Sequence, residues 1–141
     1  MPTSTEITRA VKLPKLDVLF EGGVHMEWPK PPEYTCLSFS CLNLPKTNFV
    51  AWWDVPLHKT ATFFETTDCT YKSNSYSFNT GSTTSAVTGM YFFSDGAKPI
   101  RSVMLGWTEG VELNEEEEKK KKTTKVKIKR SCNLKKTDGW M

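Results

Sequence analysis

The four cysteines are the residues of this 141-residue chain whose chemistry is easiest to anticipate, and they stand at Cys36, Cys41, Cys69 and Cys132. An even number of cysteines in a small, aromatic-rich chain predicts two disulfides formed in an oxidising compartment, with buried free thiols as the alternative. Three pairings are open. Because Cys36 and Cys41 are so close, pairing them alone would gain little loop-closure entropy. We therefore expect at least one disulfide that includes Cys69 or Cys132.

Metal and catalytic chemistry have little support in the sequence. Cys36 and Cys41 lack the second close pair of a zinc site, and His25 and His58 are not at ligand spacing, so no metal site and no cofactor is expected. His58, four residues after Asp54, is the only suggestive catalytic pair, and a histidine in a surface loop explains it better. With no phosphate-binding or dinucleotide motif, the chain reads as non-enzymatic, with no catalytic residue assigned.

Charge is distributed unevenly along the chain. Residues 1–113 hold nine Lys and Arg against eleven Asp and Glu, a net charge of −2, whereas residues 114–141 hold ten against five, a net charge of +5. A dense basic segment can bind nucleic acid or serve as a nuclear address. Here Glu115 to Glu118 precede Lys119 to Lys122, and no aromatics are interleaved for base stacking. Nucleic-acid binding is therefore not expected.

Three tryptophans are the candidate partner-binding residues: Trp28, Trp52 and Trp53. In a strand, Trp52 and Trp53 point to opposite faces, so one should lie in the core and the other should be exposed or covered by the N-terminal arm. An exposed tryptophan on a β-sandwich can stack on a sugar or anchor a protein partner. The alternative for each of them is ordinary core packing.

Short apolar runs separated by Gly, Pro and Asn predict an all-β chain, with helix below about one-sixth of the residues. We expect an irregular arm over residues 1–15 and one β-sandwich domain over 16–141. The expected strands lie at 16–20, 24–28, 34–42, 48–53, 61–65, 74–78, 86–93 and 100–107, with a Thr/Ser/Gly loop at 79–85.

The C-terminal part of the chain is expected to form a long charged hairpin. Residues 114–122 would be its loop, joining a strand at 102–113 to a C-terminal strand at 123–130. The alternation of Lys125, Val126, Lys127, Ile128 and Lys129 predicts an edge strand with one buried face, to which Val126 and Ile128 belong. Cys132 could tie this strand to the body of the domain. A disordered tail is the alternative.

Two stretches resemble the Greek-key motifs of βγ-crystallins. The run Ala61-Thr62-Phe63-Phe64-Glu65-Thr66-Thr67-Asp68-Cys69 is similar to the first strand and folded corner of such a motif, and Ile100 to Leu105 is similar to the later strand, in which a serine packs against the corner. Residues 34–57 resemble the second half of a preceding motif, with Ala51 where a serine would be expected. The resemblance implies a Greek-key β-sandwich like that of small secreted crystallin-like proteins of filamentous microbes.

Calcium is the ligand that this resemblance would imply, but the residues at the corresponding positions do not suit it. Calcium takes several oxygen ligands at once. The stretch around Asn48 offers one amide, and the stretch around Ser102 places Lys98 and Arg101 where ligands should be. No calcium site is expected.

Together these features predict a secreted, non-enzymatic interaction protein that binds a protein or glycan partner through an aromatic surface. No run of about 7–15 apolar residues follows Met1 as a secretory leader would require, so the extracellular assignment depends on the cysteines. The alternatives are a small secreted hydrolase or toxin with an unrecognised site, and a cytoplasmic or nuclear protein that binds through its basic C-terminal segment. No transmembrane segment is expected.

Overall fold

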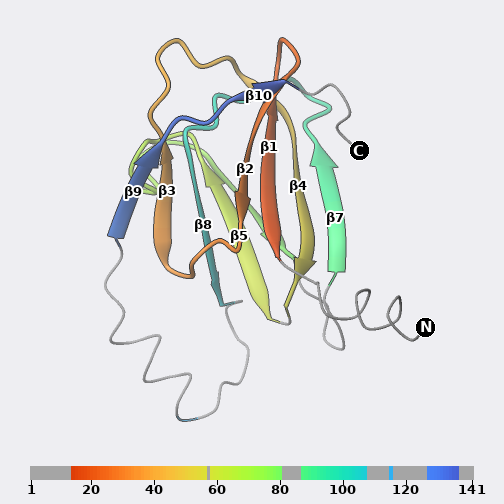
Figure 1. The fold of residues 1–141 in the computed structure, drawn as a ribbon, viewed down its shortest axis with the longest axis vertical. Helices are drawn as coiled ribbons and strands as arrows, with labels where there is room; N and C mark the ends of the chain where they lie inside the picture. Colours follow the sequence, from red (N-terminus) through yellow and green to blue (C-terminus); the bar gives the residue numbers. More distant parts are fainter. Residues whose placement is uncertain (1–13, 57, 81–86, 108–114, 116–126, 137–141) are drawn as a thin grey trace, which may run out of the picture.

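The computed structural model describes residues 14–56, 58–80, 87–107, 115 and 127–136, and the elements in these ranges are ten β-strands (Figure 1). They form two five-stranded sheets. The first sheet has the order β10 (Lys135–Lys136), β2 (Val24–Pro29), β1 (Lys15–Phe20), β4 (Thr47–Val55) and β7 (Val87–Phe92). The second has the order β6 (Ser75–Asn79), β5 (Lys59–Phe64), β8 (Ser102–Trp107), β3 (Thr35–Phe39) and β9 (Lys127–Ser131). The expected all-β sandwich is confirmed.

Alternation along the strands places one face of each sheet in the shared core. In β1, Leu16 and Val18 are fully buried and lie opposite apolar residues of both neighbouring strands. In β5, Phe63 lies opposite Val103 of β8, and both are fully buried. Because successive side chains of a strand point to opposite faces, these period-two runs account for the position of the core.

The first eight strands form two units with the same pattern. In β1–β4, strands β1, β2 and β4 belong to the first sheet and β3 crosses to the second; in β5–β8, strands β5, β6 and β8 belong to the second sheet and β7 crosses to the first. Each sheet therefore contains one strand from the other unit, which ties the two units into one sandwich. The Greek-key connectivity that we expected stays a prediction.

The start of β8 is fixed by a folded corner. Ser102 is fully buried; its hydroxyl accepts a hydrogen bond from the Cys69 N–H at 3.1 Å and donates one to the Thr66 carbonyl at 2.6 Å. Ser102 lies opposite Phe64, and in the other unit Thr47 lies opposite Phe20. Thr47, rather than Ala51, therefore takes the place that matches Ser102.

Both expected disulfides form. Cys36 pairs with Cys69, which joins β3 to the folded corner, and Cys41 pairs with Cys132, which joins the end of β3 to the segment after β9. The expectation that a disulfide includes Cys69 or Cys132 is confirmed. Cys132 does tie the C-terminal strand to the body of the domain.

The predicted C-terminal hairpin is wrong in its pairing. Strand β9 is an edge strand, as expected, but it runs parallel to β3, and β3 separates it from β8. Parallel pairing needs a long crossover, which a tight hairpin loop cannot supply. The predicted burial of Ile128 is also wrong, because this residue is 40% exposed. The loop 114–122, apart from Glu115, and the residues 123–126 lie outside the described residues, as does most of the predicted 79–85 loop.

We predict that Cys41→Ser with Cys132→Ser releases β9 from the domain. The disulfide closes a sequence separation of 91 residues, so its loss should lower the free energy of unfolding by about 4–5 kcal/mol. Urea denaturation measures this change, and hydrogen exchange should show β9 amides losing protection before those of β1. The pair Cys36→Ser with Cys69→Ser is the control and should leave β9 protected. Unchanged β9 protection in the first variant would contradict the anchoring role.

We predict that Ile128→Asp is tolerated, whereas Val103→Asp unfolds the protein. The Ile128 side chain is partly solvated on an edge strand, so the change should cost about 1 kcal/mol or less. Val103 is fully buried between the sheets, where an unpaired carboxylate costs several kcal/mol. Thermal unfolding of both variants measures the difference. A large loss of stability in Ile128→Asp would instead support the original prediction that this face of the strand is buried.

Candidate functional site

Of the three tryptophans predicted to bind a partner, Trp52 lies in the core and Trp28 packs against it. Trp52 is 9% exposed, its indole stacks on Phe78 at 5.5 Å between ring centroids, and it covers Gly89, where an added Cβ would lie 2.9 Å from the indole. Trp28 packs against the core and stacks on Phe39 at 4.8 Å. The core-packing alternative therefore holds for Trp52, whereas Trp28 packs against the core but is only partly buried.

Trp53 occupies the opposite face of the first sheet, as the strand pattern predicts. It lies opposite Lys15 of β1, whose ammonium group sits 4.3 Å from the centroid of the Trp53 ring. This geometry is a cation–π contact. Trp53 is half-buried, and a face of its ring is already used for this contact within the protein. The expected division of Trp52 and Trp53 between core and outer face is confirmed, whereas cover by residues 1–13 lies outside the described residues.

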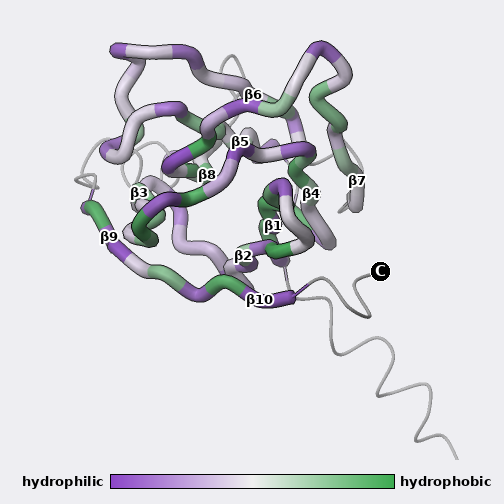
Figure 2. The backbone as a smooth tube through the Cα atoms, turned by 90° about the horizontal axis from the view of Figure 1, so that it is seen from above, coloured by the Kyte–Doolittle hydropathy of each residue, from purple (hydrophilic) through white to green (hydrophobic). Residues whose placement is uncertain are grey.

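The exposed large apolar side chains gather instead on β7. Met90, Tyr91 and Phe92 are consecutive and are 54%, 45% and 59% exposed. Phe92 lies opposite Phe49 of β4, and their rings contact at a centroid distance of 6.4 Å. In Figure 2 the hydrophobic colour of this strand runs along one side of the molecule. Three consecutive exposed apolar residues on one strand are unusual for a protein surface that has only solvent as its neighbour.

The backbone of β7 also offers hydrogen-bonding positions that no described residue occupies. The strand is the last of its sheet and pairs with β4 alone among the described residues. The Phe93 N–H donates to the Asn48 carbonyl at 3.0 Å. Because inter-strand bonding alternates along an antiparallel pair, the N–H and C=O groups of Tyr91 also face β4, whereas those of Met90 and Phe92 face away from it. An incoming strand would meet these groups directly.

A cluster of aromatic rings supports this edge from inside the sandwich. Tyr91 contacts Phe78 at 4.9 Å and Phe93 at 5.3 Å between centroids, and Tyr76 contacts Phe93 at 5.1 Å. Tyr76 donates a hydrogen bond to Glu65 at 2.6 Å; burial, followed by this hydrogen bond, raises the pKa of the tyrosine well above its ordinary value. These contacts join β6 and β7, the edge strands of the two sheets, so that β7 packs against aromatic rings on its inner face.

The bulge in β4 fixes the position of β7. The register between the two strands shifts between Trp52 and Val55. Asp54 has a φ of 51° there, and its backbone N–H donates to the Thr88 hydroxyl at 3.1 Å. His58, which also has a positive φ, shares no hydrogen bond with the Asp54 carboxylate in the part of the chain that the structure describes. The geometry assembles no catalytic pair from these two residues.

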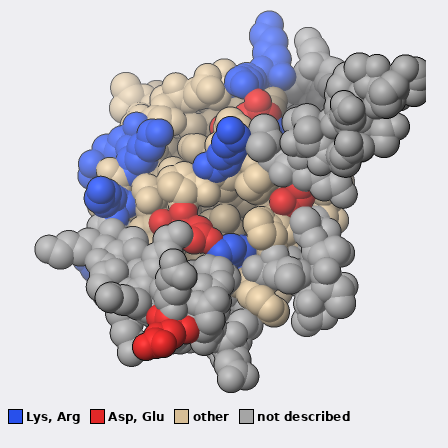
Figure 3. Space-filling view, turned by 60° about the horizontal axis from the view of Figure 1, so that its bottom comes forward, with Lys and Arg blue, Asp and Glu red and all other residues tan. Residues whose placement is uncertain are grey.

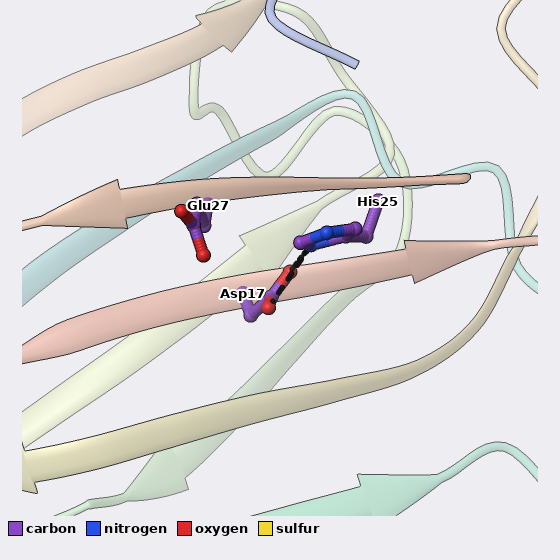
Figure 4. Close-up of side chains that lie close together, drawn as sticks. All are labelled: Asp17, His25 and Glu27. Atoms are coloured by element: carbon purple, nitrogen blue, oxygen red, sulfur yellow. Dashed lines mark hydrogen bonds and ion pairs between the residues drawn. The ribbon is translucent and has the colours of Figure 1, made fainter. Parts of the chain in front are cut away.

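A second group of functional side chains lies on the outer face of the first sheet. His25 and Glu27 are two residues apart on β2 and so share a face, and Asp17 of β1 lies opposite Glu27. Figure 4 shows Asp17 and His25 pointing toward each other, with the His25 Nδ1–H donating to the Asp17 carboxylate at 2.9 Å. Both are buried. One ligand atom from each of the three residues lies within 4.8 Å of the others.

These three residue types can ligate a metal ion, but their contacts describe an ion-pair network. The Glu27 carboxylate accepts hydrogen bonds from the ammonium groups of Lys135 at 2.8 Å and Lys15 at 3.4 Å. The Asp17 carboxylate is hydrogen-bonded to His25. A cation at this position would compete with two ammonium groups for Glu27. The network joins β10 to β2 and β2 to β1, and a structural role suits it better than metal binding.

We predict that the Glu27–Lys135 contact weakens in acid. The hydrogen bond from Lys135 holds the pKa of Glu27 below its ordinary value of 4.5. A carboxyl group with a lowered pKa in the folded state stabilises the protein above its unfolded pKa, and this contribution is lost as the pH falls through the folded pKa. The difference in melting temperature between the parent and Glu27→Gln should therefore shrink as the pH falls from 6 to below 4.5. Lys135→Gln should remove much of this pH dependence, and a constant difference would contradict the assignment.

The residues of the β7 edge were missed in the sequence because an apolar strand is ordinarily a buried one. The run Met90-Tyr91-Phe92 has the composition of a core strand, and only its place at the end of a sheet exposes it.

No helix among the described residues is long and apolar enough to cross a membrane. Comparisons with protein-family models, with curated proteins and with solved structures found no significant match to this chain. The resemblance to βγ-crystallins is therefore neither supported nor contradicted by relatives.

Proposed function

We propose that this protein is a secreted, non-enzymatic binding protein that captures an extended segment of a partner protein by adding it as a strand to the edge of β7. The observation that carries the proposal is the combination of outward-facing backbone groups and exposed apolar side chains at Met90 and Phe92. An extended peptide complements such an edge, because main-chain hydrogen bonds supply affinity and alternate side chains supply specificity.

The composition of β7 distinguishes it from an ordinary sheet edge. Natural edges are usually blocked by lysine, proline or inward charge, and Val87–Phe92 contains none of these. Strand β6, the corresponding edge of the second sheet, also lacks these residues, but Ser77 on its outer face contacts Thr62 at 2.9 Å and offers an added strand no apolar side chain. The β7 edge is therefore the better candidate of the two.

A protein partner suits the geometry better than a glycan. The glycan hypothesis depended on exposed tryptophan rings, and Trp28 and Trp52 are packed against the core. Met90 and Phe92 lie on the same face of β7, beside Phe49, and form a stripe that alternate apolar residues of an added strand would cover. A single added strand would contact this stripe and pair with the backbone groups beside it.

Secretion remains part of the proposal and is supported by the two disulfides, since such bonds persist mainly in oxidising compartments. The relationship to βγ-crystallin-like proteins also remains a proposal. It is supported by the contact between Ser102 and the folded corner, which the resemblance implied.

We predict that peptides selected from a displayed library of random linear sequences bind this edge. Met90→Pro should weaken their binding at least tenfold, because proline removes an N–H that faces the ligand while leaving the ladder to β4 intact. Met90→Ala is the matched control, since it shortens the same side chain but keeps the N–H. Isothermal titration calorimetry measures the affinities, and hydrogen exchange should show protection of the Met90 and Phe92 amides on binding.

Two results would contradict strand addition at β7. If the selected peptides bind Met90→Pro and the parent with equal affinity, or protect amides elsewhere, β7 is not the binding edge. If Met90→Ala weakens binding as much as Met90→Pro, side-chain contact rather than backbone pairing is responsible.

A further inference from the structure

The side of the molecule formed by β9 and β10 differs chemically from the β7 side. The segment 127–136 contains five basic residues and no Asp or Glu, and all five are exposed: Lys127, Lys129, Arg130, Lys135 and Lys136. Figure 2 shows β9 running toward β10 along one side of the sandwich, and Figure 3 shows Lys and Arg gathered on the side where β9 lies. Only Lys135 of these five is paired with a described carboxylate, that of Glu27.

Aliphatic side chains project from the same region. Leu42 is 90% exposed and directly follows Cys41, and Leu134 is 38% exposed and lies two residues after Cys132. Since Cys41 and Cys132 form a disulfide, the two leucine-bearing segments are covalently held together. Ile128, 40% exposed, shares its face of β9 with Arg130, because successive side chains of a strand alternate. We call Leu42, residues 127–130 and residues 134–136 the basic rim.

We propose that the basic rim binds the surface of a membrane that contains anionic phospholipids. Lysine and arginine near such a surface are attracted to its negative potential, each contributing about a fivefold factor to binding. Protruding aliphatic side chains enter the boundary between headgroups and acyl chains and add hydrophobic affinity. The rim presents both kinds of group, and this combination matches a lipid surface.

The aliphatic residues favour lipid over a soluble polyanion. A sulfated glycan or a nucleic acid would use the basic groups, but it would gain nothing from an almost fully exposed Leu42. Single-stranded nucleic acid would in addition need aromatic rings on which bases stack, and the segment 127–136 contains no aromatic residue. The disulfide holds Leu42 beside the cationic segment, so apolar and charged contacts can be made at once.

The test is co-sedimentation of the intact protein with vesicles of phosphatidylcholine containing phosphatidylserine, compared with vesicles of phosphatidylcholine alone. We expect binding to the anionic vesicles only, weakened by salt. Lys129→Glu should weaken this binding at least tenfold. The matched control is Lys30→Glu, which changes an exposed lysine just after β2 and alters the net charge by the same amount. It should weaken binding less than threefold. Melting temperatures establish that both variants are folded.

Leu42→Asn separates a lipid surface from other polyanions. It should weaken vesicle binding severalfold and leave any binding to heparin or single-stranded DNA unchanged. Equal losses in Lys129→Glu and Lys30→Glu would show that overall charge rather than the rim is responsible, and would overturn the proposal. Vesicle binding that is insensitive to Leu42→Asn, or binding to heparin or DNA without binding to vesicles, would also overturn it.

Discussion

The burial of two apolar sheet faces against each other is the interaction on which the rest of this structure depends. Val18 and Val50 of the first sheet, and Phe63 and Val103 of the second, are fully buried in one core cluster. Burying a side chain of this size contributes roughly 1.5–3 kcal/mol. The exchange of β3 and β7 between the sheets makes this core shared by both four-stranded units, so neither unit keeps its apolar face covered without the other.

The two open sides of the sandwich are closed by different chemistry. On the β6 and β7 side, aromatic rings bridge the sheets, with Trp52, Phe78 and Tyr91 in contact. On the other side, β9 belongs to the second sheet and β10 to the first, and the disulfide Cys41–Cys132 fixes the chain between them. This division leaves an apolar edge on one side and a basic rim on the other. The proposed protein-binding edge and the proposed lipid-binding rim can therefore be occupied together.

The network of the buried Asp17 and His25 with the partly buried Glu27 fits the same arrangement. Lys135 is supplied by β10, so the contact with Glu27 depends on the crossing of the chain from β9 to the first sheet. Burying charged groups is costly unless they are paired and hydrogen-bonded. The network therefore specifies where β10 docks, and it accounts for a histidine and carboxylates on a sheet face without invoking catalysis.

Much of this protein was determined by local sequence alone. Period-two runs such as Leu16-Asp17-Val18 predicted the strands to within a few residues at most ends, because alternation of apolar and polar residues is a property of each strand by itself. The even number of cysteines likewise predicted the disulfides without knowledge of the fold, since the redox compartment and the chain size govern whether disulfides form.

Tertiary structure decided the disulfide pairing, the partner of β9 and the exposure of each aromatic residue. Lys127–Ser131 reads as an edge strand in any fold, but only the assembled sheet shows that it pairs with β3 and leaves Ile128 exposed. Trp52 and Phe92 both lie in apolar strands, yet one is covered by Phe78 and the other lies at the end of a sheet. The position of a strand in its sheet is set by contacts distant in sequence, which no local pattern records.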